Sequence, residues 1–184
     1  MKLKAFERDP LSALVHVQIA LCYWNQRRYD DAIEWANRAL ALNPHHLHAR
    51  EFLASAYLQK GDFDRYLAEV LDHAALAGVA AGELEPLKAA YAAGGPSRVW
   101  TYSLEQMAGN PNVPALQLAV FAAQARDIDA AFLYLDRAIT ARDPSLVDLA
   151  VAPQWDALRH DARFEQSVTR MRLPVLAARS IVVE

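Results

Sequence analysis

Three imidazole side chains lie close together in this sequence, at His45, His46 and His48. Imidazole is a common metal ligand and changes its charge near neutral pH. His46 and His48 are two residues apart, so they point to different sides if the segment is helical. We therefore interpret the cluster as the solvated start of a helix, with a metal site as the alternative, and we expect no bound metal and no cofactor.

The one thiol, Cys22, lies beside Tyr23 and Trp24 in an apolar run. A single cysteine excludes an intrachain disulfide framework and any cysteine-based zinc finger. No Lys, Arg or His lies within one helical turn to stabilise a thiolate, so we expect Cys22 to pack as a small apolar side chain. The sequence also lacks a glycine-rich phosphate loop, an H-E-x-x-H segment and a G-x-S-x-G segment, so we expect a protein that is not an enzyme.

The C-terminal stretch has a basic bias that comes from five arginines: Arg159, Arg163, Arg170, Arg172 and Arg179. Asp161 and Glu165 alternate with them, which favours a solvated helix with ion pairs between neighbouring side chains. An acidic or phosphorylated partner is the alternative. We expect no nucleic acid, because no lysine follows Lys88 and no aromatic side chains are interleaved for bases to stack on.

The elements that must position these side chains are predicted to be helices. The chain has 184 residues, of which 54% are apolar and 36 are alanine, the best helix former. This length suits one domain or one array of repeats, and the formal net charge of -3 argues against binding nucleic acid by bulk charge. The longest uncharged window, 106–125, is broken by two prolines, so we expect no membrane partner and a cytoplasmic protein.

Similar residues recur at a fixed spacing through the first half of the chain. An interval of 34, which we call the repeat interval, relates five pairs: Pro10 and Pro44, Ile19 and Leu53, Ala20 and Ala54, Tyr23 and Tyr57, and Tyr29 and Phe63. Self-similarity at a fixed interval of this size indicates stacked helix–turn–helix units. Antiparallel helices need small residues where they cross most closely, and we predict that Ala20, Ala32 and Ala39 lie there, with Ala32 almost fully buried.

The segment that begins at Ala13 resembles the tetratricopeptide repeat family. It carries the residue types of the family's signature at Ile19, Tyr23, Tyr29, Ala32, Ala39 and Pro44. It departs from the family at His16, Ala20 and Arg27, where tryptophan, glycine and glycine are usual. The resemblance implies an all-α fold, a right-handed α-solenoid of helical hairpins with a capping segment at its C-terminal end.

The pattern predicts a single array with seven segments. They are a remnant of an earlier repeat (1–10), repeat 1 (11–44), repeat 2 (45–78), an irregular hairpin broken at Gly94-Gly95-Pro96 (79–110), repeat 3 (111–143), a cap (144–174) and a tail (175–184). In repeat 2, Tyr66 and His73 stand where alanine is expected, while Ala68 and Ala75 keep the spacing of seven two residues later. We therefore expect the second pair of helices to cross at an altered distance or register.

The C-terminal part is similar to the C-terminal helical region of many bacterial signalling proteins. The similarity covers 87–100 and 129–174 and includes Asp143-Pro144, Pro153, Leu158-Arg159, Asp161, Arg163, Phe164 and Leu173-Pro174. In those proteins, tetratricopeptide units follow a winged-helix regulator, a nucleotide cyclase or a kinase domain. The resemblance implies that this chain is the regulatory part of a larger bacterial signalling protein.

The tetratricopeptide resemblance also implies a concave groove, built from the first helix of each unit. The candidate partner-binding residues of this groove are Leu14, Val17, Leu21, Trp24, Asn25, Glu51, Ser55, Gln59, Leu116, Val120 and Gln124. Some relatives hold a peptide carboxylate with a lysine and an asparagine, but Val17 and Leu21 occupy those two positions here. The surface is apolar at both ends and polar in the middle, so we expect a protein or peptide partner such as an amphipathic helix. A small ligand in the groove, or burial of these residues by packing, is the alternative.

Two expectations concern the ends of the array. The predicted helix 11–26 carries apolar side chains on every side, and such a helix is normally buried on every side. We therefore expect the chain to form a homodimer through it. At the other end, we predict that three apolar side chains fold back onto the helices around Leu118 and Leu135, because an array must shield its last apolar face. These three are Trp155, Leu158 and Phe164.

Overall fold

The computed structural model describes residues 9–174. These residues form α-helices and short 3₁₀ helices and contain no strand, so the predicted all-α fold of helical hairpins is confirmed. The chain divides into two compact units, Met1–Lys88 and Ala89–Glu184. The predicted tail at 175–184, with Arg179, and most of the predicted remnant at 1–10 lie outside the described residues.

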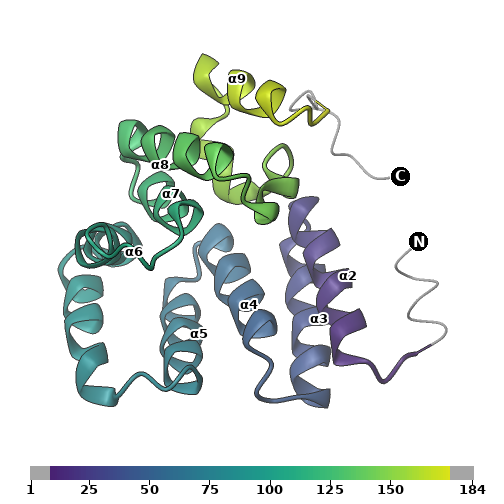
Figure 1. Ribbon diagram of the computed structural model, residues 1–184. Helices are drawn as coiled ribbons and strands as arrows, with labels where there is room; N and C mark the ends of the chain where they lie inside the picture. Colours follow the sequence, from purple (N-terminus) through teal and green to yellow (C-terminus); the bar gives the residue numbers. More distant parts are fainter. Residues whose placement is uncertain (1–8, 175–184) are drawn as a thin grey trace. The chain divides into compact units, whose positions relative to one another are not determined.

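The first unit contains two successive helical hairpins (Figure 1). α2 (Ala13–Asn25) packs on α3 (Tyr29–Leu42), α4 (Leu47–Lys60) packs on α5 (Phe63–Leu76), and α3 packs on α4. The short 3₁₀ helix η1 (Ala81–Leu84) contacts α5 and leads into α6 (Glu85–Met107). The first unit is therefore built from two helical hairpins that pack on each other through α3 and α4.

Alanines are among the most deeply buried residues of the first unit. Ala20, Ala32 and Ala39 are 0%, 1% and 0% exposed, as the sequence predicts. Ala49 and Ala56 of α4 are also fully buried. Because alanine has almost no side chain, the helix backbones can approach one another closely at each of these positions.

The second hairpin keeps the register of the first, so of the two expected alternatives, an altered distance or an altered register, the altered register is not observed. Tyr66 follows Ala32 at the repeat interval and is 1% exposed, so it takes the same place in α5 that Ala32 takes in α3. Ala68 and Ala75, the residues that favoured a shifted register, are exposed. The larger side chain at the crossing is accommodated without moving the helix by two residues.

Four helices are followed by an arginine in the left-handed region: Arg27, Arg126, Arg142 and Arg172, with φ between 54° and 63°. In this conformation the N–H group of the next residue can donate a hydrogen bond to the carbonyl oxygen of the residue five positions before it. Arg28 donates in this way to Tyr23 O at 3.0 Å, and Asp127 donates to Ala122 O at 2.9 Å. Gly61, with φ 75°, has the same role after α4. The turn therefore forms at Arg27 without glycine, and the cation is favourably placed at the negative end of the helix dipole.

The helix α6 is broken where the sequence predicts a break. Gly94 and Gly95 are not helical, and Gly95 has φ 63°. A Cβ atom on Gly94 would lie 2.9 Å from Cβ of Arg98, which leaves no room for a side chain. Gly95 follows Gly61, and Tyr91 follows Tyr57, at the repeat interval, so the period continues into the predicted irregular hairpin, 79–110.

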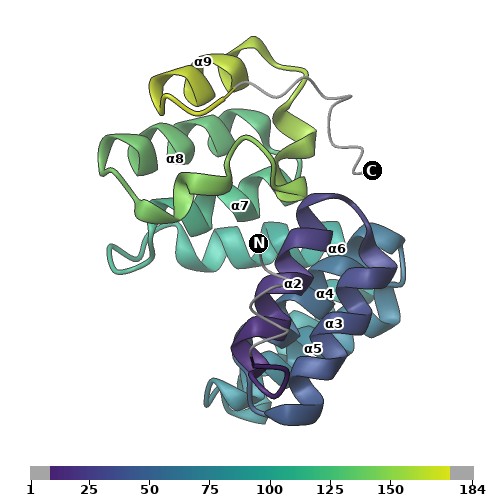
Figure 2. The same cartoon turned by 90° about the vertical axis from the view of Figure 1, so that its right-hand side faces the viewer.

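In the second unit, three helices lie one above another in the order α7, α8, α9 (Figure 2). α7 (Ala115–Gln124) and α8 (Ile128–Thr140) form a hairpin, and α9 (Ala162–Arg170) packs on α8. Ala119, Ala122 and Ala131 at the hairpin contact are all 0% exposed. Ala122 thus fills a place that holds a tyrosine in the first two hairpins.

The predicted fold-back of the C-terminal segment is confirmed. Two 3₁₀ helices, η2 (Pro144–Asp148) and η3 (Pro153–Leu158), join α8 to α9, and η3 packs on α7. Trp155, Leu158 and Phe164 are 2%, 0% and 5% exposed. This apolar burial is the main reason for the segment to stay attached to the hairpin.

The predicted helix 11–26, which is apolar on every side, corresponds to α2, and only some of its apolar side chains are exposed to solvent. Val17, Ile19 and Trp24 of α2 are buried, whereas Leu14 is 59% exposed and Leu11, just before the helix, is 77% exposed. Val15, Leu21 and Tyr23 of the same helix are half-buried. Among residues 9–174, no helix is both long enough and apolar enough to cross a membrane.

Candidate functional site

The first helices of the two N-terminal hairpins share one surface stripe. On α2 the stripe consists of Leu14, Gln18, Leu21 and Asn25, and on α4 it consists of His48, Phe52, Ser55 and Gln59, which follow them at the repeat interval. Residues four, seven and eleven positions apart lie on the same side of an α-helix. Because α2 also contacts α4, the two stripes lie next to each other. We call this surface, together with Glu51 at its edge, the α2–α4 face.

Two of the predicted groove residues lie beneath the α2–α4 face. Val17 and Trp24 are only 2% and 4% exposed. Val17 packs with Ala39 and Ala49, and the Trp24 ring lies 6.2 Å from the ring of Phe52. The sequence placed both residues on an open groove, but α4 packs against the side of α2 that carries them. They support the face and do not line it.

The other predicted residues of the first unit are accessible. Leu14 is exposed, Leu21, Asn25, Ser55 and Gln59 are half-buried, and the Glu51 side chain is 60% exposed. These side chains are therefore anchored on helices of the packed unit and still reach solvent.

The three predicted residues of the second unit lie on α7. Leu116, Val120 and Gln124 are half-buried. The Gln124 side chain donates from Nε2 to the main-chain oxygen of Gln154 at 3.1 Å. Gln124 therefore holds η3 in place, which the sequence did not indicate because the two residues are 30 positions apart.

Charged groups are scarce on α2 and α4. α2 has no Asp, Glu, Lys or Arg, and α4 has only Arg50, Glu51 and Lys60. Arg50 donates from Nη1 to Glu69 at 3.0 Å and to Asp72 at 3.0 Å on α5. Lys60 pairs with Asp30 of α3. Arg50 and Lys60 are therefore both neutralised by the second helices of the hairpins.

Arg50, Glu69 and Asp72 form a cluster that is partly buried, and this burial affects the pKa of Glu69. The Arg50 and Glu69 side chains are each 19% exposed. Burial raises the pKa of Glu69, and the hydrogen bond and charge of Arg50 oppose this rise. The arrangement fastens α5 to α4.

The histidine cluster has the character of an exposed helix start. The His48 side chain is 73% exposed and its Nδ1 lies 3.3 Å from Glu51. The rings of His46 and His48 are 6.3 Å apart. In the part of the chain that the structure describes, no three His, Cys, Asp or Glu side chains are grouped so that they could hold a metal ion. Cys22 is half-buried on α2.

One buried histidine was not singled out from the sequence. His16 is 4% exposed, its Nδ1 lies 2.8 Å from Ser12 O, and its ring lies 5.3 Å from that of Trp35. Its position, where the family prefers tryptophan, was the available signal, because an aromatic ring fits the same space. His16 therefore connects the start of α2 to α3.

Three arginines of the C-terminal stretch, Arg159, Arg163 and Arg170, form side-chain hydrogen bonds within the second unit. Arg159 donates from Nη1 to Ala150 O at 2.8 Å and from Nη2 to Ala152 O at 3.1 Å, and its Nε donates to Asp156 at 2.6 Å. These bonds fix the irregular path between η2 and η3. Arg159 is thus a structural residue.

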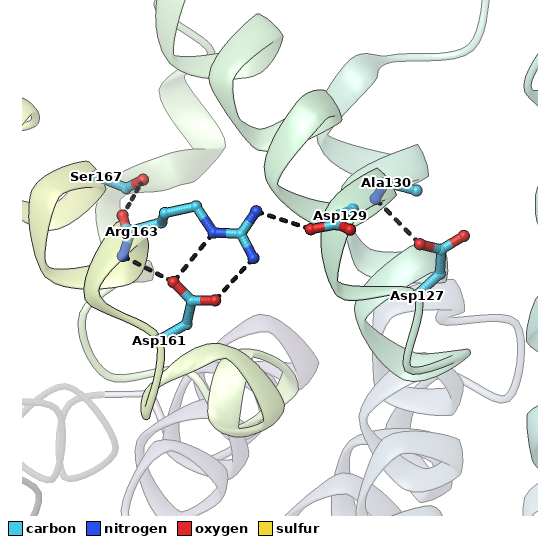
Figure 3. Close-up of polar contacts among 6 residues, drawn as sticks. All are labelled: Asp127, Asp129, Ala130, Asp161, Arg163 and Ser167. Carbon is cyan, nitrogen blue, oxygen red and sulfur yellow. Dashed lines mark hydrogen bonds and ion pairs between the residues drawn. The ribbon is translucent and has the colours of Figure 1, made fainter.

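Arg163, in the first turn of α9, joins this helix to α8 (Figure 3). It donates to Asp161 at 2.7 and 3.0 Å and to Asp129 of α8 at 2.8 Å. Its guanidinium also lies 4.3 Å above the Phe132 ring. Hydrogen bonds from Arg163 lower the pKa of Asp161 from 3.8 to about 2, and both carboxylates raise the pKa of Arg163. The expected ion pairing is present, but the partners are aspartates and not Glu165.

Comparisons with known proteins were made for the whole chain. A search of the curated proteins found no match. A solved structure described as "YrrB: a TPR protein with an unusual peptide-binding site" matches with 16% identity over 92% of this chain and 90% of that chain, with a TM-score of 0.42. Residues 13–46 match the family model of the tetratricopeptide repeat. The first hairpin, α2 and α3, is therefore similar to the tetratricopeptide repeat family in both sequence and helix–turn–helix fold.

Proposed function

We propose that this chain is a non-catalytic protein–protein interaction module whose α2–α4 face binds a peptide segment of a partner. The observation that carries the proposal is the exposure pattern of that face. Leu14 and Leu21 remain accessible on α2, above a layer in which Val17 and Trp24 are buried. Apolar side chains that pack against a buried layer on one side and face solvent on the other lose little side-chain entropy when a partner covers them.

The similarity of 13–46 to the tetratricopeptide repeat supports a binding role. The proposal extends to the second hairpin through the repeated positions, since the stripe of α4 follows that of α2 at the repeat interval. An amphipathic helix is the partner that such a shallow, two-helix surface accommodates best.

Selection from a displayed library of random 14-residue peptides tests the proposal. The whole chain is immobilised, and enriched peptides are then measured against Leu21→Asp and Leu133→Asp. Leu133 is the matched control because it is an apolar residue, 52% exposed, on α8 of the other unit. Binding that is lost with Leu21→Asp and kept with Leu133→Asp supports the face, whereas binding that survives Leu21→Asp contradicts it.

We further propose that the chain acts as the regulatory part of a larger bacterial signalling protein in the cytoplasm. Support comes from the resemblance carried by 87–100 and 129–174, including Phe164, which is buried on the last hairpin, and Arg159, which fixes the chain before it. Reading the coding sequence on either side of this segment tests the proposal. A neighbouring regulator, cyclase or kinase domain in the same reading frame is the expected result.

Self-association as a homodimer is a separate part of the proposal. Leu11 and Leu14 form an exposed apolar pair at the start of α2. A stable interface buries roughly 800 Å2 on each partner, which is several times what two leucines expose. A dimer through this end would therefore need further residues of the chain around the pair.

A further inference from the structure

We infer that the α2–α4 face selects an amphipathic helical segment that sets apolar side chains against α2 and a lysine or arginine against Glu51. The inference rests on the proposed function, because it specifies the chemistry of the partner at the same face. Its basis is the distribution of apolar and charged groups between the two helices.

The α2 side of the face is apolar. Leu14 and Leu21 lie on one side of the helix, two turns apart, which corresponds to about 10 Å along the axis. No residue of α2 carries a formal charge. Covering these leucines with polar or charged groups would bury those groups without partners, so the surface favours apolar side chains at a similar spacing.

The α4 side of the face carries one charged side chain, Glu51, that has no Lys or Arg partner in the contacts that the structure records. Arg50 is held by Glu69 and Asp72, and Lys60 is held by Asp30. Glu51 has only the imidazole of His48 beside it, at 3.3 Å, and its side chain is 60% exposed. Of the formally charged residues of α2 and α4, Glu51 is thus the one without a cation from Lys or Arg in the contacts that the structure records.

These two features together specify the sign of the partner's charge. A peptide helix lying on α2 and α4 that covers the leucines brings its flank to the edge where Glu51 lies. A cation there gains an ion pair with Glu51, while a carboxylate there meets a like charge. Because Glu51 is exposed, the gain is moderate and falls with rising salt.

The experiment compares the peptides that three forms of the whole chain select from the same random library. They are the wild type, Glu51→Lys, and Asp64→Lys as the matched control. Asp64 lies exposed on α5, so its substitution changes the net charge equally but leaves the face intact. We expect the wild type and Asp64→Lys to enrich lysine or arginine on one flank of an apolar stripe, and Glu51→Lys to enrich aspartate or glutamate there.

The binding affinities of a selected peptide and of its Lys→Glu counterpart then measure the size of the charge preference. We expect the counterpart to bind wild type roughly fivefold more weakly at low salt, and the order of the two peptides to reverse with Glu51→Lys. Peptides that require Leu21 but show the same charge preference with Glu51→Lys overturn this inference alone. Peptides that do not require Leu21 overturn the proposed function as well.

Discussion

Asp129 and Arg163 lie 34 residues apart, and their side chains form an ion pair of 2.8 Å between α8 and α9. Asp136 and Arg170 pair between the same helices at the same interval. The residues that cap the two helices, Asp127 and Asp161, are also separated by the repeat interval. α9 therefore occupies the place of the second helix of one more repeat, whose first helix is replaced by η2 and η3.

The first prediction concerns pH. Because the pKa of Asp161 is lowered to about 2 in the folded chain, the Asp161–Arg163 pairing contributes stability above pH 4. That contribution is lost as the pH falls through about 2. Asp161→Asn keeps a capping oxygen but no charge, so its free energy of unfolding should fall less than that of wild type between pH 4 and 2. Urea titrations across this range measure the difference, and parallel curves would contradict the assignment.

The second prediction tests the register of the hairpins. Ala32 is 1% exposed and Ala68 is exposed on the equivalent helix of the next hairpin. Ala32→Leu should lower the free energy of unfolding by about 1–3 kcal/mol, because the helices have no room for the added methyl groups. Ala68→Leu should change it by less than about 0.5 kcal/mol. Equal melting of the two variants would show that Ala32 does not lie at a tight crossing.

The third prediction uses a charge pair that is reversed between hairpins. Arg28 pairs with Asp31 at 2.8 Å, and at the equivalent positions of the next hairpin Asp62 pairs with Arg65 at 3.5 Å. In each hairpin the arginine lies over a tyrosine, Tyr23 or Tyr57. Exchanging Arg28 and Asp31 keeps the pair and adds a capping carboxylate like that of Asp62.

The double variant Arg28→Asp, Asp31→Arg should therefore be as stable as wild type or up to about 1 kcal/mol more stable. Arg28→Asp alone should be less stable than the double variant, because it removes the ion pair with Asp31 and sets two like charges three residues apart. Thermal unfolding of both variants makes the comparison. A double variant that is less stable than the single one would refute the interchangeability of the two arrangements.

The fourth prediction concerns the C-terminal segment. Truncation after Asp143 removes Trp155, Leu158 and Phe164, which are buried in the second unit. The apolar surface that they cover would then face water, so we expect aggregation or loss of cooperative unfolding. Circular dichroism and light scattering of the truncated chain are the measurements. A soluble chain with a sharp unfolding transition would mean that the segment does not shield the hairpin.

The fifth prediction concerns self-association. Because we propose a dimer through the exposed end of α2, sedimentation at micromolar concentration should give twice the monomer mass, and Leu14→Glu should return it to the monomer. Val17 is unsuitable for this test because it is buried and a glutamate there would disrupt the core. Leu133→Glu, at another exposed leucine, is the control, and a wild-type monomer would exclude the dimer.

The sequence by itself determined the hairpins. Alanines at the crossings, tyrosines at the repeat interval and the Gly94-Gly95-Pro96 break depend on local size and backbone preference, which are properties of residue type. The burial of Ala32 follows from the same patterns, because small residues fit where two helices cross closely. The fold-back of Trp155 does so too, because large apolar side chains are stabilised by burial away from water.

Tertiary packing decided which of the repeated positions are covered. Val17 and Trp24 share the outward-facing pattern of Leu14 and Leu21, yet α4 buries the first two and leaves the others accessible. Periodicity gives a side chain's direction around its own helix but not which neighbouring helix lies there. For the same reason the pairing of Asp129 with Arg163 could not be predicted, since an ion pair depends on the distance between two helices, and that distance is set by the apolar side chains packed between them.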